Sequence, residues 1–108
     1  MKIERTNNNL VITIESTNAL DFSALQKTIE CYPEQNVILL ISSKPLLDKE
    51  AEFLVNLTIE RKTNGTSFVV VSTDITADEA PEGLNLVPTL LEAEDIIQME
   101  NIERELGF

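Results

Sequence analysis

Acidic side chains are the residues of this chain most able to do chemistry, and they gather in its C-terminal third. They form two groups, Asp74, Asp78 and Glu79, and Glu92, Glu94 and Asp95. Carboxylates this close in sequence could hold a calcium ion or serve as an acid and a base. Neither group has the ligand spacing of an EF-hand loop with its central glycine. The second group falls in a predicted helix, where neighbouring positions point in different directions, so we interpret it as a solvated face.

The chain also lacks the residues that other common catalytic sites require. The chain has no histidine and a single cysteine, Cys31, which excludes Ser-His-Asp triads, Cys-His dyads and the common zinc sites. Cys31 has no activating base near it in sequence, so we interpret it as a buried or idle thiol. The three glycines are far apart and form no phosphate-binding loop. We therefore predict that the protein is not an enzyme and uses no metal or cofactor.

The formal net charge of −11 is unevenly distributed. Residues 1–73 carry seven basic and nine acidic side chains, whereas residues 74–108 carry ten acidic side chains and one basic one, Arg104. Such a field repels nucleic-acid phosphates and attracts a basic protein surface. The open alternative is an acidic surface that only keeps the protein soluble.

The bulk features predict one cytoplasmic domain over residues 1–108. The first fifteen residues hold no uninterrupted apolar segment, so we expect no signal peptide. No run of about 18 apolar residues could span a bilayer. A lone cysteine cannot form an internal disulfide, which also favours the cytoplasm.

Strands and helices are expected to alternate after an opening hairpin. Strands are predicted at 2–6, 10–14, 36–42, 67–72 and 84–87, a loop or short helical turn at 74–83, and helices at 18–32, 48–62 and 90–106. The apolar run 36–42 indicates a central strand covered on both faces. This order, ββαβαβ(α)βα, predicts an α/β fold with a mixed sheet of about five strands and helices packed on it.

Several residues mark where these helices begin, end and pack. Asn18 or Asp21 is expected to cap the first helix and Asp48 the second, whereas Asn64-Gly65 should end the second. Thr89 to Glu92 reads as a capping box that opens the last helix. The buried stripe of the second helix is expected at Ala51, Leu54, Val55 and Thr58. That of the last helix is expected at Ala93, Ile96, Ile97, Ile102 and Leu106.

Two segments resemble the anti-sigma-factor antagonist (STAS) domain family. The apolar strand 37–42, followed by Asp48-Lys49-Glu50-Ala51, is similar to the family's buried strand and the Asp-Ser-Ser/Thr-Gly start of its second helix. The segment Val87-Pro88-Thr89-Leu90-Leu91-Glu92-Ala93 resembles the family's last strand and final helix start. The likeness covers about residues 9–102. It implies a STAS-like fold of the short bacterial type and a protein partner.

The resemblance also shows what this chain lacks. In phospho-regulated members, the partner anti-sigma kinase phosphorylates the serine after the motif aspartate. Here Asp48 keeps the aspartate, but Lys49 stands at the phosphoacceptor position and Ala51 at the motif glycine. Lysine cannot take that phosphoryl group in the family's way, so the charge switch is absent. Ser42 and Ser43, just before the loop, are the open alternative for modification.

Short STAS-like chains that end like residues 87–108 sometimes carry the label ribonuclease Z. That nuclease family holds two zinc ions with a cluster of histidines and aspartates. A chain without histidine cannot be that enzyme. Such a label would fit a protein that acts beside the nuclease.

We therefore expect a non-catalytic regulatory protein–protein interaction module, similar to an anti-sigma-factor antagonist but without the phosphoacceptor serine. Its partner-binding residues are predicted at the degenerate motif and helix start: Ser43, Lys44, Asp48, Lys49, Glu50, Ala51 and Glu52. The partner would be an anti-sigma-factor-like kinase or a nuclease, with no nucleic acid and no membrane, and the chain itself a monomer. The alternatives are an accessory partner of a nuclease and a module that holds a small anion at the same helix N-terminus.

Overall fold

The strands of this protein form one mixed sheet. The structure is a computed structural model that describes residues 1–6, 9–15, 21–42, 46–73 and 80–107. Its strands are β1 (Lys2–Arg5), β2 (Asn9–Ile14), β3 (Asn36–Ile41), β4 (Phe68–Val71) and β5 (Leu86–Val87). Its helices are α1 (Phe22–Glu30), α2 (Asp48–Thr63) and α3 (Leu90–Glu105). The predicted α/β class and mixed five-stranded sheet are confirmed.

The spatial order of the strands follows their order in the chain, from β1 to β5. β1 and β2 form the expected antiparallel hairpin, with Ile3 opposite Ile12. The pairs β2–β3, β3–β4 and β4–β5 are all parallel. Because parallel neighbours need a crossover connection, α1 links β2 to β3 and α2 links β3 to β4.

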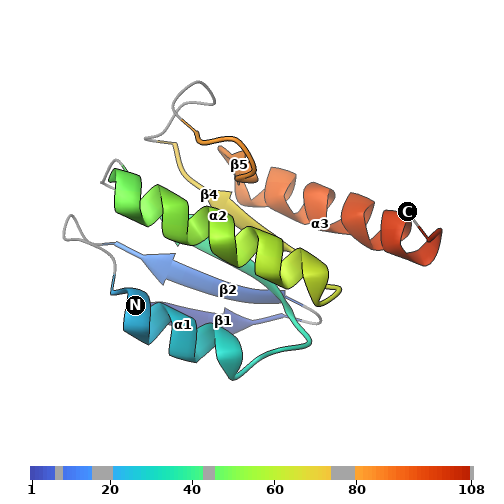
Figure 1. Cartoon of the computed structure of the whole chain (residues 1–108), viewed down its shortest axis with the longest axis horizontal. Helices are drawn as coiled ribbons and strands as arrows, with labels where there is room; N and C mark the ends of the chain where they lie inside the picture. The colour runs from blue at the N-terminus through green and yellow to red at the C-terminus, as the bar shows by residue number, and fades with distance from the viewer. Residues whose placement is uncertain (7–8, 16–20, 43–45, 74–79, 108) are drawn as a thin grey trace.

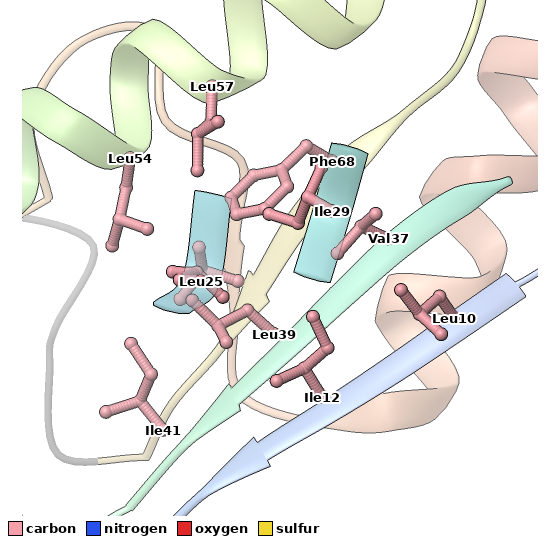
Figure 2. Packing of buried hydrophobic residues seen from close by; sticks show 11 residues of the cluster. Leu10, Ile12, Leu25, Ile29, Val37, Leu39, Ile41, Leu54, Leu57 and Phe68 are labelled. Atoms are coloured by element: carbon pink, nitrogen blue, oxygen red, sulfur yellow. The ribbon is translucent and has the colours of Figure 1, made fainter. Parts of the chain in front are cut away.

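The helices cover both faces of this sheet, two on one side and one on the other. Figure 1 shows α1 and α2 in front of the strands and α3 farther from the viewer. The α1–α2 face holds the larger core: Leu10, Ile12, Leu25, Ile29, Val37, Leu39, Ile41, Leu54, Leu57, Phe68 and Val70. In Figure 2, Leu54 and Leu57 point from α2 into this cluster. The opposite face buries Val11, Ile38, Val69, Val71, Ala93 and Ile97.

The continuous apolar runs of β3 and β4 follow from this arrangement. Alternate residues of a strand point to opposite faces, and here both faces are covered, so almost every position of β3 and β4 is buried. β1 lies at an edge and is exposed along its whole length. Its charged residues Lys2, Glu4 and Arg5 discourage pairing with another strand.

Most of the predicted helix ends are confirmed. Asp21 caps α1 by accepting a hydrogen bond from the backbone N–H of Ala24 at 3.0 Å, whereas Asn18 lies outside the described residues. Asn64 ends α2, and Gly65 follows with a φ of 87°, which favours glycine. Thr89 caps α3 and accepts from the N–H of Glu92 at 3.2 Å.

The predicted cap of α2 is wrong. The N-cap is Leu47, and Asp48 is the first residue of the helix proper. Leucine has no side-chain acceptor, so Glu50 reaches back instead, and its Oε1 accepts from the backbone N–H of Leu47 at 2.9 Å. This is one of the two hydrogen bonds of a capping box, the one in which the N3 side chain accepts from the N-cap N–H. Position 47 therefore does not need a polar side chain.

The buried stripes of two helices also differ from those predicted. α2 buries Glu50, Leu54, Leu57, Thr58 and Arg61, whereas Ala51 and Val55 are only half-buried. In α3, Ala93 and Ile97 are buried and Ile96 is half-buried, but Ile102 and Leu106 are exposed. Cys31 is exposed rather than buried. No helix in the described part has both the length and the apolar character needed to cross a membrane.

Replacing Leu54 with alanine should test the larger core. Leu54 is fully buried between α2 and the sheet, so Leu54→Ala should lower the free energy of unfolding by about 2–5 kcal/mol. Ile59→Ala, on the exposed side of the same helix, should change it by less than about 0.5 kcal/mol. Urea unfolding of both variants measures this. Equal losses would contradict the placement of α2.

Candidate functional site

The predicted partner-binding residues lie around the first turn of α2. This turn stands at the carboxyl end of β3, the edge where α/β sheets commonly place their binding sites. Asp48, Lys49 and Glu52 are exposed there, and Ala51 is half-buried. Ser43 and Lys44 lie outside the described residues. The structure therefore brings together at the surface three charged members of the predicted set.

Leu47 adds an apolar side chain that the sequence did not single out. It precedes the first turn and is 56% exposed, between the half-buried Leu46 and the exposed Asp48. Lys49 makes no ion pair among the described residues, so its ammonium group is available to a partner. An exposed leucine beside exposed charges of both signs is the kind of surface a protein partner can cover.

Stacking between helices holds this turn in place. The rings of Phe22, at the start of α1, and Phe53, in the second turn of α2, are stacked with centroids 4.4 Å apart. Both side chains pack against the larger core. The stacked rings therefore join the N-terminal ends of the two helices.

Glu50 belongs to the structure of this turn and not to its surface. Its side chain is only 2% exposed, and its carboxylate accepts from the N–H of Leu47. A buried carboxylate at a helix N-terminus also complements the helix dipole. Together with Asp48 it places two negative charges where an anionic ligand would bind, which weakens the case for a small-anion site.

The opposite, amino-terminal edge of the parallel strands carries a polar network. One polar residue stands at or just before the start of each parallel strand: Asn9, Asn36, Ser67 and Asn85. Asn36 Nδ2 donates to Asn9 Oδ1 at 3.3 Å, and its Oδ1 accepts from the N–H of Ser67 at 2.9 Å. Asn36 and Ser67 are buried, so these bonds satisfy groups that water cannot reach.

Glu100 of α3 is the acceptor that completes the network. Its Oε1 accepts from the Ser67 hydroxyl at 2.6 Å and its Oε2 from Asn85 Nδ2 at 3.1 Å. Arg104 Nη2 donates to Ser67 Oγ at 3.1 Å, and Lys62 Nζ lies 3.6 Å from Glu100 Oε2. The side chain of Glu100 is only 12% exposed. Its contacts connect α3 to α2 and to the residues that precede β4 and β5.

A cavity of about 260 Å³ opens beside this network and is lined by Lys62, Glu100, Glu103 and Arg104. Both cations that line it already face Glu100, and the Glu100 carboxylate already accepts two hydrogen bonds. Lys62, Glu100 and Arg104 are therefore used in the contacts that attach α3, whereas Glu103 is exposed. In the described ranges, no three or more His, Cys, Asp or Glu side chains are placed to hold a metal ion.

Arg61 completes the polar contacts at this edge. Its Nη2 donates to the carbonyl of Tyr32 at 2.9 Å and to that of Gln35, which fixes the turn before β3. Burial lowers the pKa of Arg61, and the neighbouring Glu60 partly opposes that effect. Arg5 lies over the ring of Tyr32, 5.1 Å from its centroid, and attaches β1 to the same turn.

The two acidic groups noted in the sequence have different outcomes. Asp74, Asp78 and Glu79 lie outside the described residues. Glu92, Glu94 and Asp95 are exposed on α3. The exposure of this second group confirms its interpretation as a solvated face.

Sequence reasoning missed the polar network, although a signal for it exists. Each of the four parallel strands follows directly on, or begins with, an asparagine or serine: Asn9-Leu10, Asn36-Val37, Ser67-Phe68 and Asn85-Leu86. The repetition of a small polar residue before each apolar run marks a shared edge. Glu100 had no comparable signal, because its partners are distant in sequence.

Replacing Glu50 and Glu52 separately should distinguish a structural carboxylate from a surface one. Glu50→Ala should lower the free energy of unfolding by about 1–3 kcal/mol, because it leaves the Leu47 N–H without its acceptor. Glu52→Ala, which removes an exposed carboxylate two residues later, should change it by less than about 0.5 kcal/mol. Thermal and urea unfolding measure both. A stable Glu50→Ala protein would show that the Glu50–Leu47 bond is dispensable.

The amino-edge network can be tested at Glu100. Glu100→Gln keeps the side-chain shape but turns an acceptor into a donor facing Asn85 or Ser67. It should therefore lower the free energy of unfolding by about 1–3 kcal/mol. Glu103→Gln, an exposed residue of the same cavity, serves as the matched control and should be nearly neutral. Equal stability of the two variants would contradict the central place of Glu100.

The sequence matches no protein-family model and no curated protein at a significant level. The chain has an α/β fold, with a polar network at the amino ends of its parallel strands and an exposed turn, with Leu47, Asp48, Lys49 and Glu52, at the carboxyl end of β3.

Proposed function

We propose that this chain is a regulatory protein–protein interaction module, similar to an anti-sigma-factor antagonist but without the phosphoacceptor serine. Its binding surface is the first turn of α2, with Leu47 as the apolar contact and Asp48, Lys49 and Glu52 as charged contacts. The residues that precede the turn, Ser43 and Lys44, belong to the same proposed surface by their position in the sequence.

The exposure of Leu47 is the observation that carries the proposal. Leu47 is the N-cap residue of α2 and is 56% exposed, whereas Leu54 and Leu57 within the helix are buried. Exposed single leucines are common, but this one stands at the carboxyl end of β3, two residues before Lys49, which makes no ion pair with another described residue. A partner that covers Leu47 would bury it between charges of both signs.

The STAS resemblance supports the same surface independently. It assigns the motif aspartate to Asp48 and the phosphoacceptor position to Lys49, and both are exposed. A lysine there carries a permanent positive charge where phosphorylated members gain a negative one. Binding through this turn would therefore be controlled by the amount of partner, and not by phosphorylation at this position.

The small-anion alternative has less support. An anion at the start of α2 would meet the carboxylates of Asp48 and Glu50, and Glu50 already takes the Leu47 N–H. Nothing in the described residues favours a nuclease as the partner over another protein.

The proposal is tested by affinity capture from the native cell extract. Lys49→Glu and Leu47→Ser should each reduce the amount of captured partner about tenfold or more, because they reverse a contact charge and remove the apolar contact. Lys27→Glu, the same charge change on an exposed lysine of α1, is the matched control and should capture as wild type does.

Retention of the same partner by all three variants would show that the first turn of α2 is not the binding surface. No partner enriched over an unrelated acidic control protein would contradict the interaction-module function itself.

A further inference from the structure

Two segments of the last helix, α3, place glutamates at the same spacing after an apolar residue, eleven residues apart. Leu91-Glu92-Ala93-Glu94-Asp95 is followed eleven residues later by Ile102-Glu103-Arg104-Glu105-Leu106. Eleven residues are close to three turns of an α-helix, at about 3.6 residues per turn. Each residue of the first segment therefore lies on nearly the same side of α3 as its counterpart in the second.

One side of this repeat is used by the fold. Ala93 and Ile97 are buried against β3 and β4, and Glu100 and Arg104 continue the same side into the amino-edge network. The contacts on this side attach α3 to the sheet.

The opposite side carries a second apolar stripe. Leu91, Met99, Ile102 and Leu106 are 56–69% exposed. Asp95 fills the remaining position between Leu91 and Met99, so the stripe follows spacings of four, four, three and four residues. This is the pattern of a helix that packs against another helix. A sheet-packed helix with a second, uncovered stripe of four large side chains marks an interaction face.

Carboxylates line both borders of this stripe. The period places Glu92 and Glu103 on one border and Glu94 and Glu105 on the other. All four are exposed, as is Asp95 within the stripe. No basic residue of α3 lies on this side, because Arg104 faces the network around Ser67.

We propose that the outer face of α3, formed by Leu91, Asp95, Met99, Ile102 and Leu106, binds an amphipathic helix of a partner protein whose apolar stripe is bordered by lysine or arginine. The apolar spacing fits a helix, and the acidic borders require basic ones opposite them. Asp95 would meet a cation within the partner's stripe, which fixes the register of the pair. This surface is distinct from the first turn of α2, and the proposal does not depend on the function assigned to that turn.

The charges on the borders argue against the other occupants of such a face. Antiparallel pairing with a second copy would bring Glu92 and Glu94 beside Glu103 and Glu105. Parallel pairing would bring each of these glutamates beside its own counterpart. Repulsion between the carboxylates therefore opposes both kinds of pairing. Helices that lie on membranes carry lysine and arginine on their polar side, and this one carries carboxylates.

The test measures fluorescence anisotropy of labelled helical peptides titrated with the whole chain. One peptide has a leucine stripe bordered by lysine and arginine, and a second has the same stripe bordered by glutamate. The chain should bind the basic peptide at least tenfold more tightly than the acidic one, and more weakly as salt rises. Met99→Ser combined with Ile102→Ser should weaken binding at least tenfold. Glu103→Lys combined with Glu105→Lys should reduce or reverse the preference.

Two controls separate this surface from the rest of the chain. Ile59→Ser, on the exposed side of α2, and Lys49→Glu should both bind the basic peptide as wild type does. Circular dichroism verifies that each variant is folded. Failure of Lys49→Glu to capture its partner with peptide binding intact would show that the two surfaces are independent.

Four results would overturn the proposal. Equal affinity for both peptides, or unchanged affinity in the Met99→Ser, Ile102→Ser variant, would show that α3 does not select a basic helix. Sedimentation equilibrium that shows a dimer abolished by the same variant would assign the face to a second copy. Binding to vesicles of zwitterionic or anionic lipid that is lost in this variant would assign it to a membrane.

Discussion

The structure depends on covering both faces of β3 and β4. These strands lie at the centre of the parallel part of the sheet and bury nearly every side chain. The strand order runs in one direction, so the two crossover helices, α1 and α2, share a face. The other face is left to α3 alone, which covers it with Ala93 and Ile97. Every surface available for binding follows from this division.

The amino and carboxyl ends of the parallel strands have different roles. At the amino edge, Asn36, Ser67 and Glu100 satisfy one another, and the charged residues beside them are held in the same network. At the carboxyl end, the exposed Leu47 precedes α2, and Lys49 makes no ion pair with another described residue. The amino end therefore holds the helices together, and the carboxyl end presents an exposed turn.

The sequence predicted the fold well because its signals are local. The apolar run 36–42 favoured a strand covered on both faces, which the structure shows. Asn64-Gly65 and Thr89 to Glu92 marked helix ends, because these residue types commonly end and cap helices. The same reasoning failed at Asp48, since aspartate is the commoner cap. Only the structure shows that Glu50 makes an aspartate cap unnecessary by bonding to Leu47.

The error in α3 has a different physical origin. Apolar residues lie on two sides of this helix, so spacings of three and four residues connect residues of both stripes. Ile102 and Leu106 therefore fitted a buried stripe with Ile96 and Ile97, although they face away from the sheet. The inward side is the one on which Ala93 and Ile97 pack on the sheet and Glu100 accepts from Ser67, and the second of these contacts joins residues 33 positions apart.

We propose that this chain acts by binding a protein through the first turn of α2. Site-specific photo-crosslinking in the living cell is the most direct test of that binding. A photoreactive amino acid would replace Leu47 in one variant and Ile59 in another, because both side chains are exposed to nearly the same extent on the same helix. The account predicts one discrete protein adduct from position 47 and none from position 59. No adduct from position 47, or the same adduct from both positions, would contradict it.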